Sequence, residues 1–530
     1  MRLSSPLHRD QKSVTYDFVI IGSGFGGSVS ALRLMEKGYR VLLLEKGRRF
    51  GPDDFPKTNW DLRRWMWMPR LGLRGIFKMS FFRHLTVVHG IGYGGGSLVY
   101  ANTLPLPKDR FFSSGTWSNL ADWKIELAEH YRTAQRMLGA TRNPNVTYVD
   151  EVIQDVATDM GRRDDFHPTD VAIYFGEPGK TVPDPYFAGR GPDRTGCIGC
   201  GACMTGCRFN AKNTLDKNYL YLAEKLGLEV LTEVEVCAVR PREGGYRVET
   251  RRGDVYASKN VVFAGGVLGT VELLLRMKAD PDGLPRLSDR LGHFVRTNSE
   301  SLIQVVSERR ERDLSKGIAI GSILETDPYS HLEPTRYGAG SGFFRLLAAP
   351  HVAGATFWTR MGNLMGSVLR HPLKLLRAVL VPDFSKYSVL LLYMRTLEGS
   401  LRMKLGRGVT TGFAAGLTTE LGDGPAPTAS IPEATELARR VASKIRGLPM
   451  SLVTETVLGV PTTAHILGGC CMGVSADEGV VDCDHRIFGY EGLFVIDGSA
   501  VSANPGVNPS LTITALAERA MSRIAAVDAS

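Results

Sequence analysis

Apolar runs that end in glycines and continue into helical segments recur along this chain. The first run, FVII at residues 18–21, is wholly apolar, as in a parallel strand covered on both faces. A glycine-rich turn, a helical segment and a second apolar run, RVLLLEKG at 40–47, follow it. This order predicts a βαβ unit over residues 16–47.

Two later stretches repeat the same transition from strand to turn to helix. Residues 260–277 (NVVFAGGVLGTVELLLRM) contain an apolar strand, a glycine turn and a helix. Residues 489–520 contain a strand that ends at Asp497, a loop and a final helix. With no internal repeat and no long Pro/Ser linker, these units predict an α/β fold of intimately packed domains.

Composition bounds the class of protein. A chain of 530 residues exceeds a single ordinary core, and its 43% hydrophobic and 22% charged residues are typical of a soluble protein. The formal net charge of +9 is spread along the chain without a dense basic block, so nucleic acid is not an expected partner. No apolar run reaches the roughly 20 residues that span a bilayer.

The N-terminal residues 1–18 lack the apolar core of a signal peptide, so we expect a cytoplasmic protein. Disulfides are rare in that compartment. The eight cysteines are therefore expected to be thiols or metal ligands.

The first glycine turn has the pattern of a dinucleotide site. Gly22, Gly24 and Gly27 form G-x-G-x-x-G, which allows a tight turn and a close approach of the backbone to a pyrophosphate at a helix N-terminus. Glu45 ends the second strand, eighteen residues after Gly27. An acid at that place hydrogen-bonds a ribose hydroxyl. The unit by itself leaves FAD and NAD both open.

The order of the blocks GSGFGGSVSALRL, HGIGYGGGSLVYANTL (89–104), RTNSES (296–301), TAHILGG (463–469) and the C-terminal unit resembles the glucose–methanol–choline (GMC) oxidoreductases. Within that family the resemblance is strongest to bacterial cholesterol oxidases, especially mycobacterial ones. It implies bound FAD in a discontinuous, Rossmann-like domain with a parallel sheet, made of residues 15–115, 205–298 and 465–530. Residues 116–204 and 299–464 would form an α+β substrate-binding domain with an antiparallel sheet.

The resemblance also implies a set of cofactor-binding residues, which we expect to hold FAD noncovalently. They are Gly22, Gly24, Phe25, Gly26, Gly27, Glu45, Gly92, Gly95, Gly96, Ser97, Asn102, Val236, Ala264, Gly265, Asp497, Gly498, Asn508 and Pro509.

Flavin-dependent alcohol oxidation needs a group that takes the hydroxyl proton while hydride leaves for flavin N5. By resemblance, His465 of TTAHILGG handles the proton and Asn508 of NPGVNPSL binds the substrate oxygen. Cholesterol oxidases carry a further glutamate that moves a ring double bond, and Glu333 in HLEPTRYG is the candidate here. A surface glutamate before Pro334 is the alternative.

Cys197, Cys200, Cys203 and Cys207 follow the spacing C-x2-C-x2-C-x3-C, by which ferredoxins hold iron–sulfur clusters. A [4Fe–4S] or [3Fe–4S] cluster, a zinc ion and plain packed thiols are the alternatives. A cluster beside FAD would pass single electrons to a protein or quinone acceptor. Without a cluster, oxygen could reoxidise the flavin.

Two segments are both apolar and basic. Residues 60–85 hold three of the six tryptophans, and residues 351–382 contain no acidic residue. Such segments suit peripheral membrane contact or the wall of an apolar pocket, and ordinary core is the alternative. Membrane contact and an apolar pocket wall would each favour a lipophilic substrate.

The leading hypothesis is therefore an FAD enzyme that oxidises the secondary hydroxyl of a sterol-like lipid, such as cholesterol, to a ketone. A cluster-containing GMC dehydrogenase of sugars or other alcohols is the alternative within enzymes. An electron-transfer flavoprotein without its own alcohol substrate is the alternative outside that class.

Overall fold

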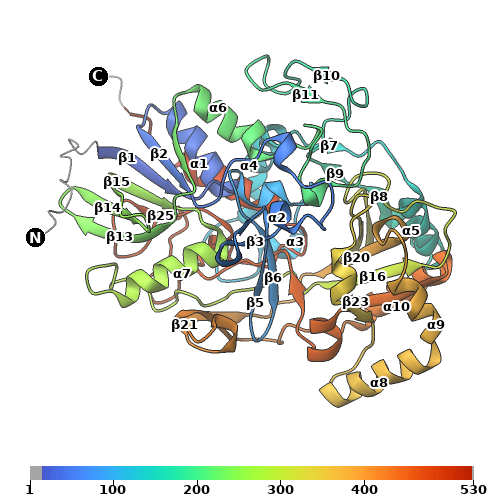
Figure 1. Ribbon diagram of the computed structural model, residues 1–530. Coiled ribbons are helices and arrows are strands. Elements are labelled where there is room, and N and C mark those ends of the chain that lie inside the picture. The colour runs from blue at the N-terminus through green and yellow to red at the C-terminus, as the bar shows by residue number, and fades with distance from the viewer. Residues whose placement is uncertain (1–14, 528–530) are drawn as a thin grey trace, which may run out of the picture.

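The computed structural model describes residues 15–527, which two seven-stranded sheets organise (Figure 1). The expectation about a signal peptide concerns mainly residues 1–14, which lie outside the described residues. The two sheets lie at opposite ends of the molecule in Figure 1, with the glycine-rich loops between them.

The first sheet has a parallel core and an antiparallel edge. Its order is β12-β2-β1-β15-β14-β13, and β25 pairs with β15. The parallel strands are β1 (Thr15–Ile21), β2 (Val41–Glu45), β12 (Glu229–Thr232), β15 (Val255–Phe263) and β25 (Leu493–Val495). β13 (Val236–Arg242) and β14 (Gly245–Thr250) add the antiparallel edge. The whole of β2 is buried, as its continuous apolar run predicts.

Helices cover this sheet. α1 (Phe25–Glu36) packs against α6 (Tyr219–Lys225) and α11 (Ser510–Ser522), and α11 packs in turn against α4 (Trp123–Met137). α7 (Gly266–Ala279) runs along β13 and the hairpin of β21 (Leu401–Gly406) and β22 (Gly416–Leu421). The expected Rossmann-like α/β architecture is confirmed.

The second sheet is antiparallel throughout, in the order β19-β23-β16-β20-β18-β17-β8. Its strands are β8 (Phe166–Pro168), β16 (Ser301–Ser307), β17 (Ser322–Asp327), β18 (Ser330–Thr335), β19 (Ala348–Pro350), β20 (Ser388–Arg395) and β23 (Gly447–Leu452). α5 (Tyr148–Asp159) and α10 (Pro432–Ile445) share an apolar core with it. This is the expected α+β layer.

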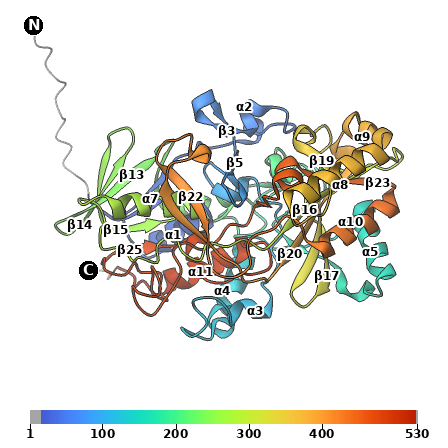
Figure 2. The ribbon, with the colours of Figure 1, turned by 90° about the horizontal axis from the view of Figure 1, so that it is seen from below.

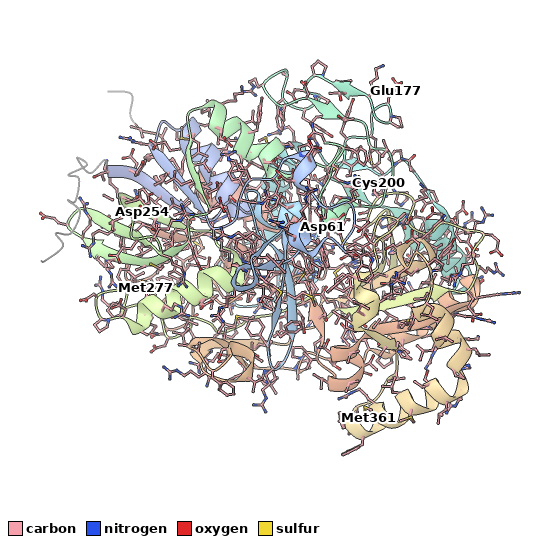
Figure 3. The ribbon with its side chains drawn as sticks, in the orientation of Figure 1. Asp61, Glu177, Cys200, Asp254, Met277 and Met361 are labelled. Carbon is pink, nitrogen blue, oxygen red and sulfur yellow. The ribbon has the colours of Figure 1, made fainter. Side chains whose placement is uncertain are left out.

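A pair of helices projects from the second sheet. α8 (Phe357–Arg370) and α9 (Pro372–Val379) lie at the edge of the molecule in Figure 1, α9 also lies near the edge in Figure 2, and Met361 marks α8 in Figure 3. No helix within residues 15–527 is long and apolar enough to cross a membrane.

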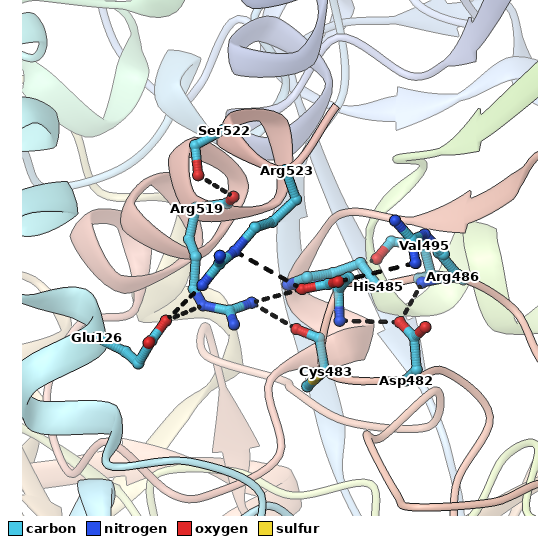
Figure 4. Close-up of polar contacts among 10 residues, drawn as sticks. Glu126, Asp482, Cys483, His485, Arg486, Val495, Arg519, Ser522 and Arg523 are labelled. Atoms are coloured by element: carbon cyan, nitrogen blue, oxygen red, sulfur yellow. Dashed lines mark hydrogen bonds and ion pairs between the residues drawn. The ribbon is translucent and has the colours of Figure 1, made fainter. Parts of the chain in front are cut away.

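All strands of the first sheet fall in the ranges expected for the FAD-binding domain, and all strands of the second in the other ranges. The exact domain boundaries stay a prediction. One helix departs from them: α4 lies within 116–204 but packs on α11 of the first layer. Glu126 of α4 accepts hydrogen bonds from Arg519 (2.9 Å) and Arg523 (3.0 Å) of α11 (Figure 4).

Candidate active site

The two glycine-rich loops meet at the N-terminus of α1. The amide of Gly94 donates to Ser23 Oγ over 3.0 Å, and Ser23 Oγ in turn lies 3.4 Å from the carbonyl oxygen of Gly92. A Cβ on Gly95 would lie 2.7 Å from the Cα of Gly24, so the two backbones touch. Two segments some seventy residues apart in the sequence, at Ser23–Gly24 and Gly92–Gly95, thus form one continuous backbone surface, which we call the glycine floor.

The glycines of the first turn serve different purposes. Gly22 has a φ of +105°, and a Cβ there would lie 2.4 Å from the carbonyl oxygen of Ala264. A Cβ on Gly26 would lie 1.7 Å from the carbonyl oxygen of Ile496. A Cβ on Gly24 would meet nothing within 4 Å, so space lies open beside it. That space, next to the uncapped amides that begin α1, suits a pyrophosphate.

Glu45 is fixed beside this open turn. Its buried carboxylate accepts hydrogen bonds from the amide (3.1 Å) and hydroxyl (2.7 Å) of Ser23 and from the amide of Gly47 (2.7 Å). The carboxylate therefore lies next to the glycine turn, where a ribose hydroxyl would meet it. Val236 is close by, since the amide of Val234 donates to the carbonyl of Glu45.

Other predicted cofactor residues surround the same floor. Asn102 has a φ of +63° and is completely buried, yet neither polar atom of its amide has a hydrogen-bond partner in residues 15–527. Phe25, at the start of α1, packs edge-on against Tyr100. An unpaired buried amide in a glycine-lined site is expected where a polar ligand belongs. These residues fit a dinucleotide such as FAD.

The carboxylate of Asp497 is bound by donors of the protein itself rather than left free for a ligand. Its carboxylate accepts four hydrogen bonds, from the amide of Gly266, the hydroxyl of Thr270 and the amide and hydroxyl of Ser499. Burial raises the pKa of Asp497, and these donors oppose the rise. Asp497 thereby joins the N-terminal end of α7, beside Gly265, to the turn of Gly498.

The candidate reacting centre is built around His465, which follows β24 (Thr462–Thr463). Its Nδ1 lies 2.7 Å from a carboxylate oxygen of Glu300, and the other oxygen accepts the amide of Ala464 over 3.1 Å. The side chain of Glu300 is only 1% exposed. This contact assigns the proton to Nδ1 and leaves Nε2 facing Asn508, whose Nδ2 is 3.4 Å away.

Backbone contacts hold Glu300 and Asn508 together. Asn298 donates through Nδ2 to the carbonyl of Val507 over 2.8 Å, which ties the entry to β16 to the loop before α11. Ser299, between Asn298 and Glu300, has a φ of +46°, a costly conformation for a residue other than glycine. The strained residue thus directly precedes Glu300, whose carboxylate contacts His465.

Burial lowers the pKa of His465, but the charges of Glu300 and Glu333 outweigh that effect and raise it above its ordinary value. Burial also raises the pKa of Glu455 to about 8, and the charge of Glu300 adds to the rise. The imidazole is therefore well placed to hold a proton that it takes from a substrate.

Glu333 is not a surface residue. It lies on β18, completely buried, with one carboxylate oxygen 3.3 Å from Nε2 of the equally buried His331. The contact has ion-pair distance but not the geometry of a hydrogen bond, so all four polar atoms of this pair lack a hydrogen-bond partner among the described residues. Asn508 Oδ1 lacks one as well. These unpaired groups are expected where a substrate supplies the partner.

Glu300 and His331 were missed by the sequence analysis. His331 lies two residues before Glu333, and the alternation of a strand puts both on one face, so a strand prediction for 330–335 would have found it. Glu300 stands 165 positions before His465, and no spacing connects them.

The cysteine loop gives the predicted cluster no support. No group of three or more His, Cys, Asp or Glu within residues 15–527 is arranged to hold a metal ion. Cys203 and Cys197 pack with Ile173 and Ile318 in an apolar cluster, and Cys200 labels the loop in Figure 3. Burial raises the pKa of Cys197 to about 11 and of Cys203 to about 12.

The glycines of this loop also have a packing role. Gly201 has a φ of +70°, and a Cβ there would lie 2.2 Å from the carbonyl oxygen of Ser315; one on Gly206 would strike the ring of Phe55. The amide of Gly201 also donates to the carbonyl of Gly317. The glycines thus let the loop pack closely against its neighbours, and the amide of Gly199 donates to Cys197 Sγ over 3.4 Å.

Comparisons with known proteins agree with this fold. Models of the GMC oxidoreductase family match residues 190–281 and 427–517, and a model of an NAD(P)-binding Rossmann-like domain matches 20–80. A cholesterol oxidase of Acinetobacter baumannii is 45% identical over 96% of this chain and 94% of its own length. The chain belongs to the GMC oxidoreductase family.

Two further relatives extend the comparison. A cholesterol oxidase of Mycobacterium tuberculosis (strain H37Rv) is 44% identical over 96% of this chain and 90% of its own length. The crystal structure of pyridoxine 4-oxidase from Mesorbium loti shares the fold, with a TM-score of 0.61 and 16% identity over 96% of this chain and 99% of that one. This GMC protein is an FAD-dependent alcohol oxidoreductase.

Replacing Glu45 by Ala should weaken FAD binding by the roughly 1.5–3 kcal/mol of a charge-assisted hydrogen bond. The reason is the loss of the buried carboxylate beside the glycine turn. Titration of the apoprotein with FAD, followed by flavin fluorescence, measures the change. Glu36→Ala, which removes a half-exposed acid from the end of α1, is the control. Equal affinities in the two variants would contradict the assignment.

Replacing Glu300 by Gln should lower the rate of flavin reduction by substrate at least about tenfold, within the ~10²–10⁴-fold that acid–base groups contribute. Because Glu300 raises the pKa of His465, the loss of rate on acidification should begin at lower pH in the variant. Stopped-flow rates across a pH series measure both effects. Glu436→Gln on the surface of α10 is the control, and an unshifted profile in Glu300→Gln would contradict the assignment.

Proposed function

We propose that this enzyme oxidises the secondary hydroxyl of a sterol-like lipid to a ketone. The observation that carries the proposal is the buried His465, whose Nδ1 is held by Glu300 while Nε2 faces Asn508. Its similarity to two cholesterol oxidases over nearly its whole length supports the substrate class. The predicted roles of His465, Asn508 and Glu333 belong to this proposal.

His465 Nε2 accepts the hydroxyl proton of the substrate. The bond from Nδ1 to Glu300 keeps Nε2 free as an acceptor and stabilises the imidazolium that forms. Asn508 donates through its amide to the substrate oxygen and holds it beside Nε2. FAD, when bound along the glycine floor, supplies the hydride acceptor.

Glu333 serves a second step, in which a ring double bond moves. A carboxylate that removes a proton from one carbon and returns it to another completes such a shift without net oxidation. The burial of Glu333 beside His331 and its unpaired oxygens support this role. The charge of Glu333 also contributes to the raised pKa of His465.

Oxygen is the proposed electron acceptor, because the two similar bacterial enzymes are named as oxidases. The alternative of a cluster that passes electrons to a protein or quinone draws no support from the cysteine loop. All eight cysteines are free, which suits the cytoplasmic location proposed here. A lipophilic substrate further favours contact with a membrane surface.

The FAD-loaded enzyme should reduce oxygen to peroxide when it is given detergent-solubilised sterols. Simple sugars and polyols should give no turnover. His465→Ala should retain FAD and lose ~10²–10⁴-fold in rate, because the hydroxyl proton then has no acceptor. Peroxide release and product analysis by mass spectrometry measure the outcome. Turnover on polyols alone would favour the dehydrogenase alternative.

Glu333→Gln should slow the double-bond shift far more than the oxidation of the hydroxyl. The amide keeps the shape of the side chain but cannot accept a proton at neutral pH. The variant should therefore release the ketone with its double bond unmoved, which absorbance of the conjugated product distinguishes. Glu325→Gln, on the partly exposed β17, is the control. Equal loss of both steps would give Glu333 another role.

A further inference from the structure

The helices α8 and α9 present an apolar stripe to solvent. Trp358 is 80% exposed and Leu369 73%, and Met365 lies between them on the same face of α8. On α9 and its end, Leu373, Leu376 and Leu380 continue the stripe at spacings of three and four residues. Single exposed leucines need no explanation, but a row of six large apolar side chains does.

The other side of α9 packs on the second sheet. Ala378 and Val381 are buried in a cluster with Met450 of β23. Arg360 of α8 donates to the carbonyls of Gly354 over 3.1 Å and Val457 over 3.4 Å. The α9 part of the stripe is thus the outer face of a packed helix, and hydrogen bonds hold α8 beside it.

Positive charges flank the stripe without partners. Residues 351–382 contain no Asp or Glu. Arg370, Lys374 and Arg377 are exposed, and none forms an ion pair with any acid of the described chain. The face therefore combines apolar side chains with free cations.

The second apolar and basic segment adjoins this face. Arg345 donates to the carbonyl of Val381, just beyond α9, over 2.7 Å, and its guanidinium also lies over the ring of Trp60. Trp60 is 40% exposed and the neighbouring Leu346 is 65% exposed. Segments 60–85 and 351–382 thus contribute to one surface, which we call the α8–α9 face.

We propose that the α8–α9 face binds an anionic lipid bilayer. The apolar stripe would enter the boundary between headgroups and acyl chains, and the cations would pair with anionic headgroups. A second copy of this chain fits less well, because it would bring the same unpaired cations together. The proposal rests on the proposed function only for its purpose, which is access to a lipid substrate.

A cavity under α8 adds to this interpretation. It has a volume of about 360 Å³, and Arg360, His351 and Glu455 are among the residues that line it. A bilayer on the α8–α9 face would therefore lie beside this cavity.

The test measures cosedimentation of the full-length, FAD-loaded enzyme with sterol-free vesicles. One set contains phosphatidylcholine alone, and the other contains phosphatidylcholine with phosphatidylserine. The variants are Trp358→Ser/Leu369→Ser and Arg370→Gln/Lys374→Gln/Arg377→Gln. Ile125→Ser/Leu226→Ser, which removes exposed apolar side chains from α4 and the end of α6, is the control.

The wild type and the control should bind the anionic vesicles, and binding should weaken with salt. Each cation near such a surface contributes roughly fivefold, so the charge variant should lose at least about tenfold in affinity. The apolar variant should lose a similar factor on both vesicle types. No vesicle binding by the wild type, or equal binding by all variants, would overturn the proposal. A wild-type dimer that the apolar variant alone dissociates would also overturn it, because the face would then bind a second copy of the chain.

Turnover of detergent-solubilised sterol separates the two proposals. All variants should retain it, because their changes lie on exposed side chains outside the reacting centre. Loss of vesicle binding with retained turnover supports the docking face. Vesicle binding by an enzyme that never oxidises sterol would overturn the proposed substrate and leave the docking face standing.

Discussion

A buried carboxylate facing an imidazole is the interaction on which this site depends. Glu300 is almost fully enclosed, and a charge so placed is costly unless it is paired and hydrogen-bonded. The Nδ1 of His465 and the amide of Ala464 provide that pairing. The same contact fixes the orientation of the imidazole, so stability and chemistry rest on one pair. The strained backbone at Ser299 is tolerated because its neighbours are tied on both sides.

The residues around this pair come from both layers of the fold. Glu300 stands at the entry to β16 of the antiparallel sheet, whereas His465 lies where the chain returns to the first layer. Asn508 belongs to the loop before α11, whose helix packs on α1. Each layer alone would contain only part of the proposed proton-handling group. Folding both layers together creates the site and the floor for the cofactor.

Glycine has two distinct roles in this chain. At Gly22 and Gly26 the missing side chain lets backbones touch, and at Gly24 it leaves a space open. In the cysteine loop, Gly201 and Gly206 allow close packing against Ser315 and Phe55. A sequence pattern counts all these glycines alike. Only the neighbours of each one distinguish a ligand floor from a packing contact.

The sequence by itself determined the local units of this protein. The βαβ unit at 16–47, the glycine turn with Glu45 and the motifs around His465 and Asn508 are each contained in a short stretch, where periodicity and turn chemistry act. Tertiary structure decided what lies across from them. Glu300 contacts His465 although 165 positions separate them along the chain. Glu333 is buried on β18, which pairs with β20, more than fifty residues further along the chain. Helix α4 joins the first layer through α11. The four cysteines share a spacing with ferredoxins, but spacing fixes only distance along the chain. The direction of a side chain depends on the surfaces that pack around it, and those come from remote segments.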